Sequence, residues 1–147
     1  MAAAAWVLYN KAKLDILKGD IDLDGHDIKV ALFSSAYSPL VADEGYADIS
    51  ANEIAAAYGY EAGGKSLTNK VVSVHDTTAG KFRSDAISWI AAGGAIAARY
   101  AVMYDNSHVD KTLICYSLLD TTPADVTAAD TTALVITPHA DGFFYAR

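Results

Sequence analysis

The chain has 147 residues, 52% of them apolar, and a formal net charge of −7. This length and composition predict one globular domain, residues 1–147, large enough to fold without disulfides or metals. The 11 basic residues are scattered, which argues against direct nucleic-acid binding because phosphate backbones are bound by clustered Lys and Arg. The most membrane-like segment, residues 86–98, is shorter than the roughly 20 residues that a spanning helix needs, so we expect no membrane partner.

The first segment predicts an amphipathic helix over about residues 6–18. Gly19 follows the last turn and is placed to end the helix. Four apolar residues recur at helical spacing and are expected to share one face: Val7, Leu14, Leu17 and Ile21.

The pattern then changes from helix to strand and loop. Residues 28–35, IKVALFSS, are short, apolar and partly β-branched, which predicts a strand. Residues from about 36–66 are predicted to form a long loop. Within it, Ser50 and Glu53 fit a capping box that opens one short helical turn. A connection of this length is usually functional or part of an interface.

We expect a β-rich core over about residues 28–147. Beyond Leu67, strands are predicted in KVVSVHD, KFRSDAISWI (as one bulged strand), AIAARYAVMYDNS, TLICYSLLD and, as two short strands, TTALVITPHADGFFYAR. The paired glycines of AAGG favour a tight hairpin between two of them. The predicted fold class is mainly β: an antiparallel β-sandwich or barrel-like core with one N-terminal α-helix.

One segment, GYEAGGKS at residues 59–66, fits the phosphate-binding loop G-x-x-x-x-G-K-[ST]. That loop must leave a buried strand and enter a helix, so that backbone N–H groups and the helix dipole point at the phosphates. Asp120, after an apolar run, would be the magnesium partner. The residues before the segment do not have a strand pattern, and those after it do. A turn at Gly63 and Gly64 that feeds the next strand, with Lys65 in solvent, is therefore the preferred interpretation.

A second segment, DIDLDG, matches the first half of a calcium-binding loop. It offers Asp20, Asp22 and Asp24 at relative positions 1, 3 and 5, with Gly25 at position 6. The twelfth position, where a bidentate Glu is needed, is Ala31, and no second helix is predicted. The three aspartates are a weak calcium candidate, and a polar turn is the alternative.

No catalytic constellation is visible in the sequence. The four histidines are widely separated, and G-x-S-x-G is absent. Cys115 is flanked by apolar residues, so it is predicted to be a buried thiol. We therefore expect no catalytic residues, no resident metal and no cofactor.

Aromatic side chains are candidates for a contact surface, because aromatic residues are enriched as interface anchors. Several lie beside glycines or near the ends of the chain. Ordinary core packing is the alternative for each of them. The candidates are Trp6, Tyr9, Tyr58, Tyr60, Phe143 and Phe144.

Seven segments occur along the chain in a fixed order: LYNKAK, GDIDL, IKVAL, DISANE, GYEAGGKSLTNK, ARYAVMYDNS and DGFF. In this ordered series, the chain resembles a family of small structural proteins encoded by tailed bacteriophages and prophages. The resemblance implies a non-enzymatic virion protein, foremost a head decoration or cement protein. Such a protein would bind the major capsid protein on the outer capsid surface, and it often forms a homo-oligomer, with a trimer favoured.

Two other functions stay open. A tail or receptor-facing adhesion component would also suit aromatic and glycine-rich loops. A nucleotide-hydrolysing enzyme built on GYEAGGKS is the remote alternative, and in the resembling family GY-x-x-GGK recurs in a protein that is not an enzyme.

Overall fold

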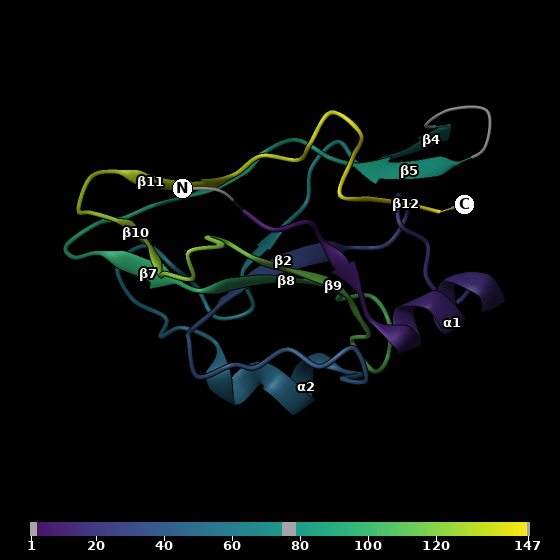
Figure 1. Cartoon of the computed structure of the whole chain (residues 1–147), viewed down its shortest axis with the longest axis horizontal. Coiled ribbons are helices and arrows are strands. Elements are labelled where there is room, and N and C mark those ends of the chain that lie inside the picture. Colours follow the sequence, from purple (N-terminus) through teal and green to yellow (C-terminus); the bar gives the residue numbers. More distant parts are fainter. Residues whose placement is uncertain (1–2, 75–78, 147) are drawn as a thin grey trace.

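The computed structural model describes residues 3–74 and 79–146 (Figure 1). Within them, the chain is mainly β, as the sequence predicts. Its helical segments are α1 (Asn10–Lys18), α2 (Tyr46–Ile49) and a 3-10 turn (Ser50–Asn52). The strands are β1 (Val7–Leu8), β2 (Ile28–Phe33), β3 (Lys65–Ser66), β4 (Val71–Val74), β5 (Gly80–Arg83), β6 (Ile87–Ile90), β7 (Ile96–Ala98), β8 (Tyr100–Asp105), β9 (Leu113–Leu118), β10 (Val126–Ala128), β11 (Ala133–Ile136) and β12 (Phe144–Ala146).

A central sheet holds most of the core. Its strand order is β1-β9-β8-β2-β3, and every neighbouring pair is antiparallel. β2, β8 and β9 are six residues long and are buried along nearly their whole length. Apolar residues on both faces explain this, because a strand covered on both sides needs no polar face. Cys115 on β9 is fully buried, as predicted.

The remaining strands form three small antiparallel sheets, which we call the outer ribbons. They are β10-β7, β11-β6 and β12-β5-β4. Figure 1 shows α2 on one side of the central strands and the ribbons with β11 and β5 on the other. This layering is sandwich-like. The sheets do not close on themselves, so the barrel-like alternative does not apply to the described residues.

The N-terminal helix starts later than predicted, at Asn10, because residues 7–8 pair with β9. Its inner face is also different. Leu14 is 49% exposed and Leu17 is 86% exposed, whereas Ala12 and Asp15 are buried. The Asp15 carboxylate can lie on the inner face because it accepts hydrogen bonds there. Helical periodicity in the sequence does not reveal such partners.

The end of α1 agrees with the sequence. Gly19 has a φ of 80° and its N–H donates to the Ile16 carbonyl, while the Asp20 N–H donates to the Asp15 carbonyl. These bonds satisfy carbonyl groups of the last turn, which have no partner within the helix.

The predicted capping box at Ser50 and Glu53 is wrong. The helical turn opens earlier, at Gly45, whose N–H donates to the Asp48 carboxylate at 3.0 Å. Ser50 begins the 3-10 turn that comes next, and the Glu53 side chain is engaged elsewhere. The long loop of about 36–66 thus contains a second helix as well as β3.

Three strand predictions also need correction. KFRSDAISWI forms two strands, β5 and β6, which belong to different ribbons. AAGG joins no hairpin, because β6 pairs with β11 and β7 pairs with β10. The long strand predicted in AIAARYAVMYDNS breaks at Arg99, between β7 and β8. The sequence pattern does not predict β10, which lies in a segment rich in alanine and aspartate. The end of KVVSVHD, with His75, lies outside the described residues.

Candidate functional site

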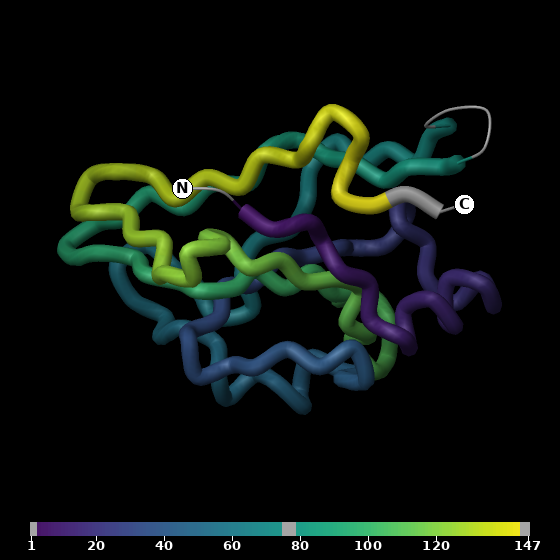
Figure 2. The backbone as a smooth tube through the Cα atoms, viewed as in Figure 1, coloured from purple at the N-terminus to yellow at the C-terminus, as the bar shows by residue number. Residues whose placement is uncertain are grey.

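A groove of about 900 Å³ lies between the N-terminal segment and the C-terminal segment. Trp6 and Phe143 meet across it edge to face, with ring centroids 5.3 Å apart. Figure 2 shows the purple N-terminal segment passing close to the yellow C-terminal segment. The lining is mostly apolar, with a few polar side chains at its rim. It comprises residues 3–8, Asn10, Lys13, Val41, Thr137, His139 and residues 141–144.

Backbone pairing fixes the N-terminal wall of this groove. In β1, Val7 is opposite Tyr116 and Leu8 is opposite Cys115. Just before β1, the Ala4 N–H donates to the Leu118 carbonyl at 2.8 Å. The wall is therefore an extension of the central sheet, so its side chains are held in place before any partner arrives.

A tight turn fixes the C-terminal wall. Gly142 has a φ of 90°, and a Cβ at this position would collide with the carbonyl oxygen of Phe82. The N–H of Phe143 donates to the same Phe82 carbonyl at 2.8 Å. Only glycine combines this backbone conformation with such a close approach. The turn at Asp141 and Gly142 therefore holds Phe143 at the groove.

The structure separates the aromatic interface candidates. Trp6 and Phe144 are half-buried and line the groove together with Phe143, which is 4% exposed. Tyr9 and Tyr60 are buried in the core and offer no contact surface.

Tyr58 lies away from the groove residues, and its side chain is 52% exposed. Its backbone has a φ of 56°, an uncommon conformation for a side chain of this size. Its carbonyl accepts the Ala92 N–H at 3.1 Å, and its ring lies against Gly94.

The hydroxyl of Tyr9 explains why a tyrosine can be buried there. It shares a hydrogen bond of 2.8 Å with the Tyr37 hydroxyl, which in turn donates to Asp43. Burial raises the pKa of both tyrosines. The hydrogen bond to Tyr37 raises the pKa of Tyr9 further, and the hydrogen bond to Asp43 raises the pKa of Tyr37 further. Both phenols therefore stay protonated and act as structural donors.

GYEAGGKS is held by the carboxylate of Glu53, the residue that sequence spacing places in a capping box. Glu53 accepts hydrogen bonds from the hydroxyls of Tyr46 and Tyr60 and from the N–H of Gly63. Tyr104 stacks on Tyr46 and donates to the Gly63 carbonyl at 2.7 Å. We call these five residues the Glu53 hub. Burial raises the pKa of its three tyrosines, so each hydroxyl keeps the proton that it donates.

The surroundings of GYEAGGKS differ from those of a phosphate-binding loop. The segment runs through turns into β3, and the described residues after it contain strands and no helix. Gly64 has a φ of 73° and its Cα lies against the Val30 carbonyl, which confirms the predicted glycine turn. Lys65 is exposed, as predicted, and its ammonium group donates to the Ser88 carbonyl at 2.6 Å. Asp120 accepts the Thr122 N–H in a turn of its own.

DIDLDG does not bring all three of its carboxylates together. Asp20, Asp22 and Asp24 form no group that could hold a metal ion, and no such group of His, Cys, Asp or Glu occurs among the described residues. Asp22 instead accepts the Gly25 N–H at 3.0 Å, and this hydrogen bond lowers the pKa of Asp22. The weak calcium candidate is therefore replaced by the polar turn.

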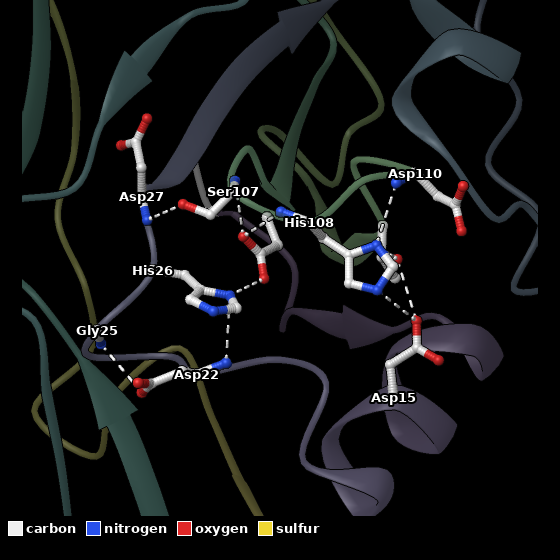
Figure 3. Close-up of polar contacts among 10 residues, drawn as sticks. Asp15, Asp22, Gly25, His26, Asp27, Ser107, His108 and Asp110 are labelled. Atoms are coloured by element: carbon white, nitrogen blue, oxygen red, sulfur yellow. Dashed lines mark hydrogen bonds and ion pairs between the residues drawn. The ribbon is translucent and has the colours of Figure 1, made fainter.

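A polar junction joins this turn to the β8–β9 connection (Figure 3). Asp105 is fully buried and receives three hydrogen bonds, from Nδ1 of His26 at 2.6 Å and from the N–H groups of Ser107 and His108. The Ser107 hydroxyl accepts the Asp27 N–H at 2.9 Å. Hydrogen bonds from neighbouring donors thus replace the hydrogen bonds to water that the Asp105 carboxylate loses on burial.

The same junction reaches α1 through Asp15. Its carboxylate accepts from Lys11 at 2.6 Å and from the Thr112 hydroxyl at 3.1 Å. Nε2 of His108 lies 4.0 Å from the same carboxylate (Figure 3). Burial alone would raise the pKa of Asp15, but the bonds from Lys11 and Thr112 outweigh it and hold the pKa below its usual range. These bonds connect α1 to the β8–β9 connection and to the turn before β2, so the junction stabilises the fold.

None of the helices in the described residues is long and apolar enough to cross a membrane. Comparisons with family models, curated proteins and solved structures found no match to this chain.

Proposed function

We propose that this chain is a bacteriophage virion structural protein that binds the outer surface of the major capsid protein lattice and stabilises the head. The observation that carries the proposal is the ordered series of seven segments, from LYNKAK to DGFF, in which the chain resembles small phage structural proteins. A cement protein works by contact, so it needs a rigid scaffold and a docking surface rather than a catalytic group.

The groove is the docking surface in this proposal. Its walls are fixed by backbone hydrogen bonds to the central sheet and to β5, so docking would cost little ordering of the protein itself. Val7 and Val41 are 39% and 41% exposed at the groove, while Trp6 forms part of its lining. An apolar loop of the capsid protein is the expected occupant. The net charge of −7 suits a surface that faces solvent rather than packaged DNA.

The location is tested by cryo-EM of the parent particle. We expect this protein on the outer surface of the head, and density in the tail alone would contradict the proposal. A homo-trimer at local three-fold positions is the oligomer that the proposal favours, and the same map would count the copies.

The docking surface is tested by adding the purified protein to particles that lack it. Val7→Lys and Val41→Lys place a charge in the apolar lining and should each weaken binding by about ten-fold or more. Ile90→Lys, at an exposed position on β6 outside the groove, is the matched control and should bind as wild type. Equal binding by all three variants would remove the groove from the proposal.

A tail or receptor-facing adhesion component is the second candidate, and the exposure of Tyr58 favours it. A large aromatic ring held on an ordered loop is a suitable recognition element. Labelling intact particles and mapping the label to head or tail separates the two candidates. Tyr58→Ala should weaken attachment to host cells only if the tail candidate is right.

A further inference from the structure

Strand β4 forms an open edge of the β12-β5-β4 sheet in the described part of the chain. It carries no charged residue, and three of its four side chains are exposed: Val71 (38%), Val72 (49%) and Val74 (75%). Exposed, uncharged edge strands pair readily with another strand, and proteins usually protect them with lysine or proline. This edge lies outside the groove, so pairing through it does not depend on docking to the capsid protein and is a contact separate from any that holds the trimer favoured above.

The ladder determines which backbone groups of β4 are free. The carbonyl of Phe82, on the middle strand, accepts from Phe143 and so points toward the C-terminal segment. Successive residues of a strand direct their N–H and C=O groups to opposite sides. The backbone N–H and C=O groups of Lys81 and Arg83 therefore point toward β4. There they bond the backbone of Ser73 and Val71, their partners in the register. The N–H and C=O groups of Val72 and Val74 must then point outward, along the open edge.

We infer that β4 pairs antiparallel with β4 of a second copy of this chain, with Ser73 opposite its own counterpart at the two-fold axis. In this register, Val72 lies opposite Val74 of the second copy, and Val74 lies opposite Val72 of the second copy. All four outward-pointing groups of Val72 and Val74 on each copy then find partners, which gives four intermolecular hydrogen bonds.

The side chains agree with the same register. Val72 and Val74 share the sheet face of Phe82, so pairing places valine against valine and extends an apolar face across the axis. A register shifted by one residue would oppose Val72 to Ser73 and place opposite faces together, which pleating does not allow. Side-chain faces and backbone hydrogen bonds thus select the same alignment.

Charge permits a second copy at this edge. Like charges directly opposite each other destabilise strand pairs, and β4 has none. Lys81 and Arg83 on β5 would be separated from their counterparts by three strand spacings, about 14 Å, which exceeds the screening length of about 8 Å at physiological salt. The contact is short, so we expect a weak dimer with a dissociation constant in the micromolar to millimolar range.

The first test is sedimentation of the full-length protein over a concentration series into the millimolar range. The wild-type chain should shift from monomer to dimer. Val72→Pro removes an outward N–H without touching the β4–β5 ladder, and Val74→Lys inserts a charge opposite Val72; both should stay monomeric. Val135→Lys, at an exposed valine on β11, should dimerise as wild type. A wild-type chain that stays monomeric, or a dimer that survives both β4 variants, would overturn the inference.

The second test determines the register directly. Ser73→Cys places two thiols opposite each other at the axis, where mild oxidation should link them into a covalent dimer. In Val71→Cys, the two thiols would lie about 14 Å apart along the strands, too far for a disulfide. The native Cys115 is fully buried and does not compete. Cross-linking of Ser73→Cys no faster than that of Val71→Cys would reject this register.

Discussion

The central sheet and the outer ribbons of this protein differ in strand length and in burial. β2, β8 and β9 each have six residues and are covered on both faces, whereas the ribbon strands have three or four residues, and β6, β7 and β11 leave alternate side chains exposed. In β6 and β11, for example, buried and exposed residues alternate strictly. The long strands of the central sheet are therefore more deeply buried than the ribbon strands, which leave some of their apolar side chains in contact with solvent.

The largest expected effect separates two glycines with the same backbone conformation. Gly64 and Gly93 have φ values of 73° and 76°, but only Gly64 lies against another backbone, at Val30 on β2. Gly64→Ala must move the central sheet as well as adopt a strained φ, so it should cost about 4 kcal/mol or more. Gly93→Ala meets no atom within 4 Å and should cost only about 1–2 kcal/mol. Urea unfolding of the two variants measures the difference, and equal losses would show that Gly64 is not a close contact.

The sequence predicts the long central strands β2 and β9 better than most of the ribbon strands for a physical reason. β2 and β9 are nearly continuous apolar runs, interrupted only by Lys29 and Ser117, and such a run indicates a strand covered on both faces without knowledge of its neighbours. β5 and β6 lie in one predicted strand, KFRSDAISWI, but they belong to different ribbons, and the strands β12 and β11 that pair with them are more than 40 residues away in sequence. β10 escapes prediction because alanine and aspartate are poor strand formers, and its pairing with β7 depends on tertiary context.

The candidate site is predictable only in part. The glycine-flanked and terminal aromatic residues include Trp6, Phe143 and Phe144, which do line one groove. Tyr9 and Tyr60 carry the same sequence signal, yet their hydroxyls have partners in the core. The sequence spacing of Ser50 and Glu53 predicts a local helix cap. It does not show that the Glu53 carboxylate meets Tyr46 and Tyr60, each seven residues away.

The Glu53 hub gives the second prediction, on the surface where the long loop meets the central sheet. Glu53→Gln keeps the size of the side chain but replaces one accepting oxygen with a donor, so a tyrosine hydroxyl loses its acceptor. We expect a loss of about 1–3 kcal/mol in the free energy of unfolding. Glu61→Gln, an exposed change in the same loop, should stay within about 0.5 kcal/mol. Similar losses in both variants would mean that the hub adds nothing to stability.

The third prediction concerns acid, at the junction of α1 with the central sheet. The pKa of Asp15 is held below its usual range in the folded protein, so its ionised form stabilises the fold. That contribution is complete above the ordinary carboxyl pKa of about 3.9 and is lost as the pH falls through the lower, folded-state pKa. Asp15→Asn should lower stability at neutral pH and flatten the decline in melting temperature below about pH 4. An unchanged acid profile would contradict this role.

The smallest expected effect returns to the contrast between sheet and ribbons with one substitution at two sites. Val135 on β11 is 54% exposed, whereas Val102 on β8 is fully buried. Val135→Thr keeps the β-branched shape and leaves the new hydroxyl in water, so the free energy of unfolding should change by no more than about 0.5 kcal/mol. Val102→Thr buries the hydroxyl without a prepared partner and should cost about 1–3 kcal/mol. If Val135→Thr proved as costly as Val102→Thr, then the outer ribbon would be covered in solution, and the exposed side of β11 would itself be an interface.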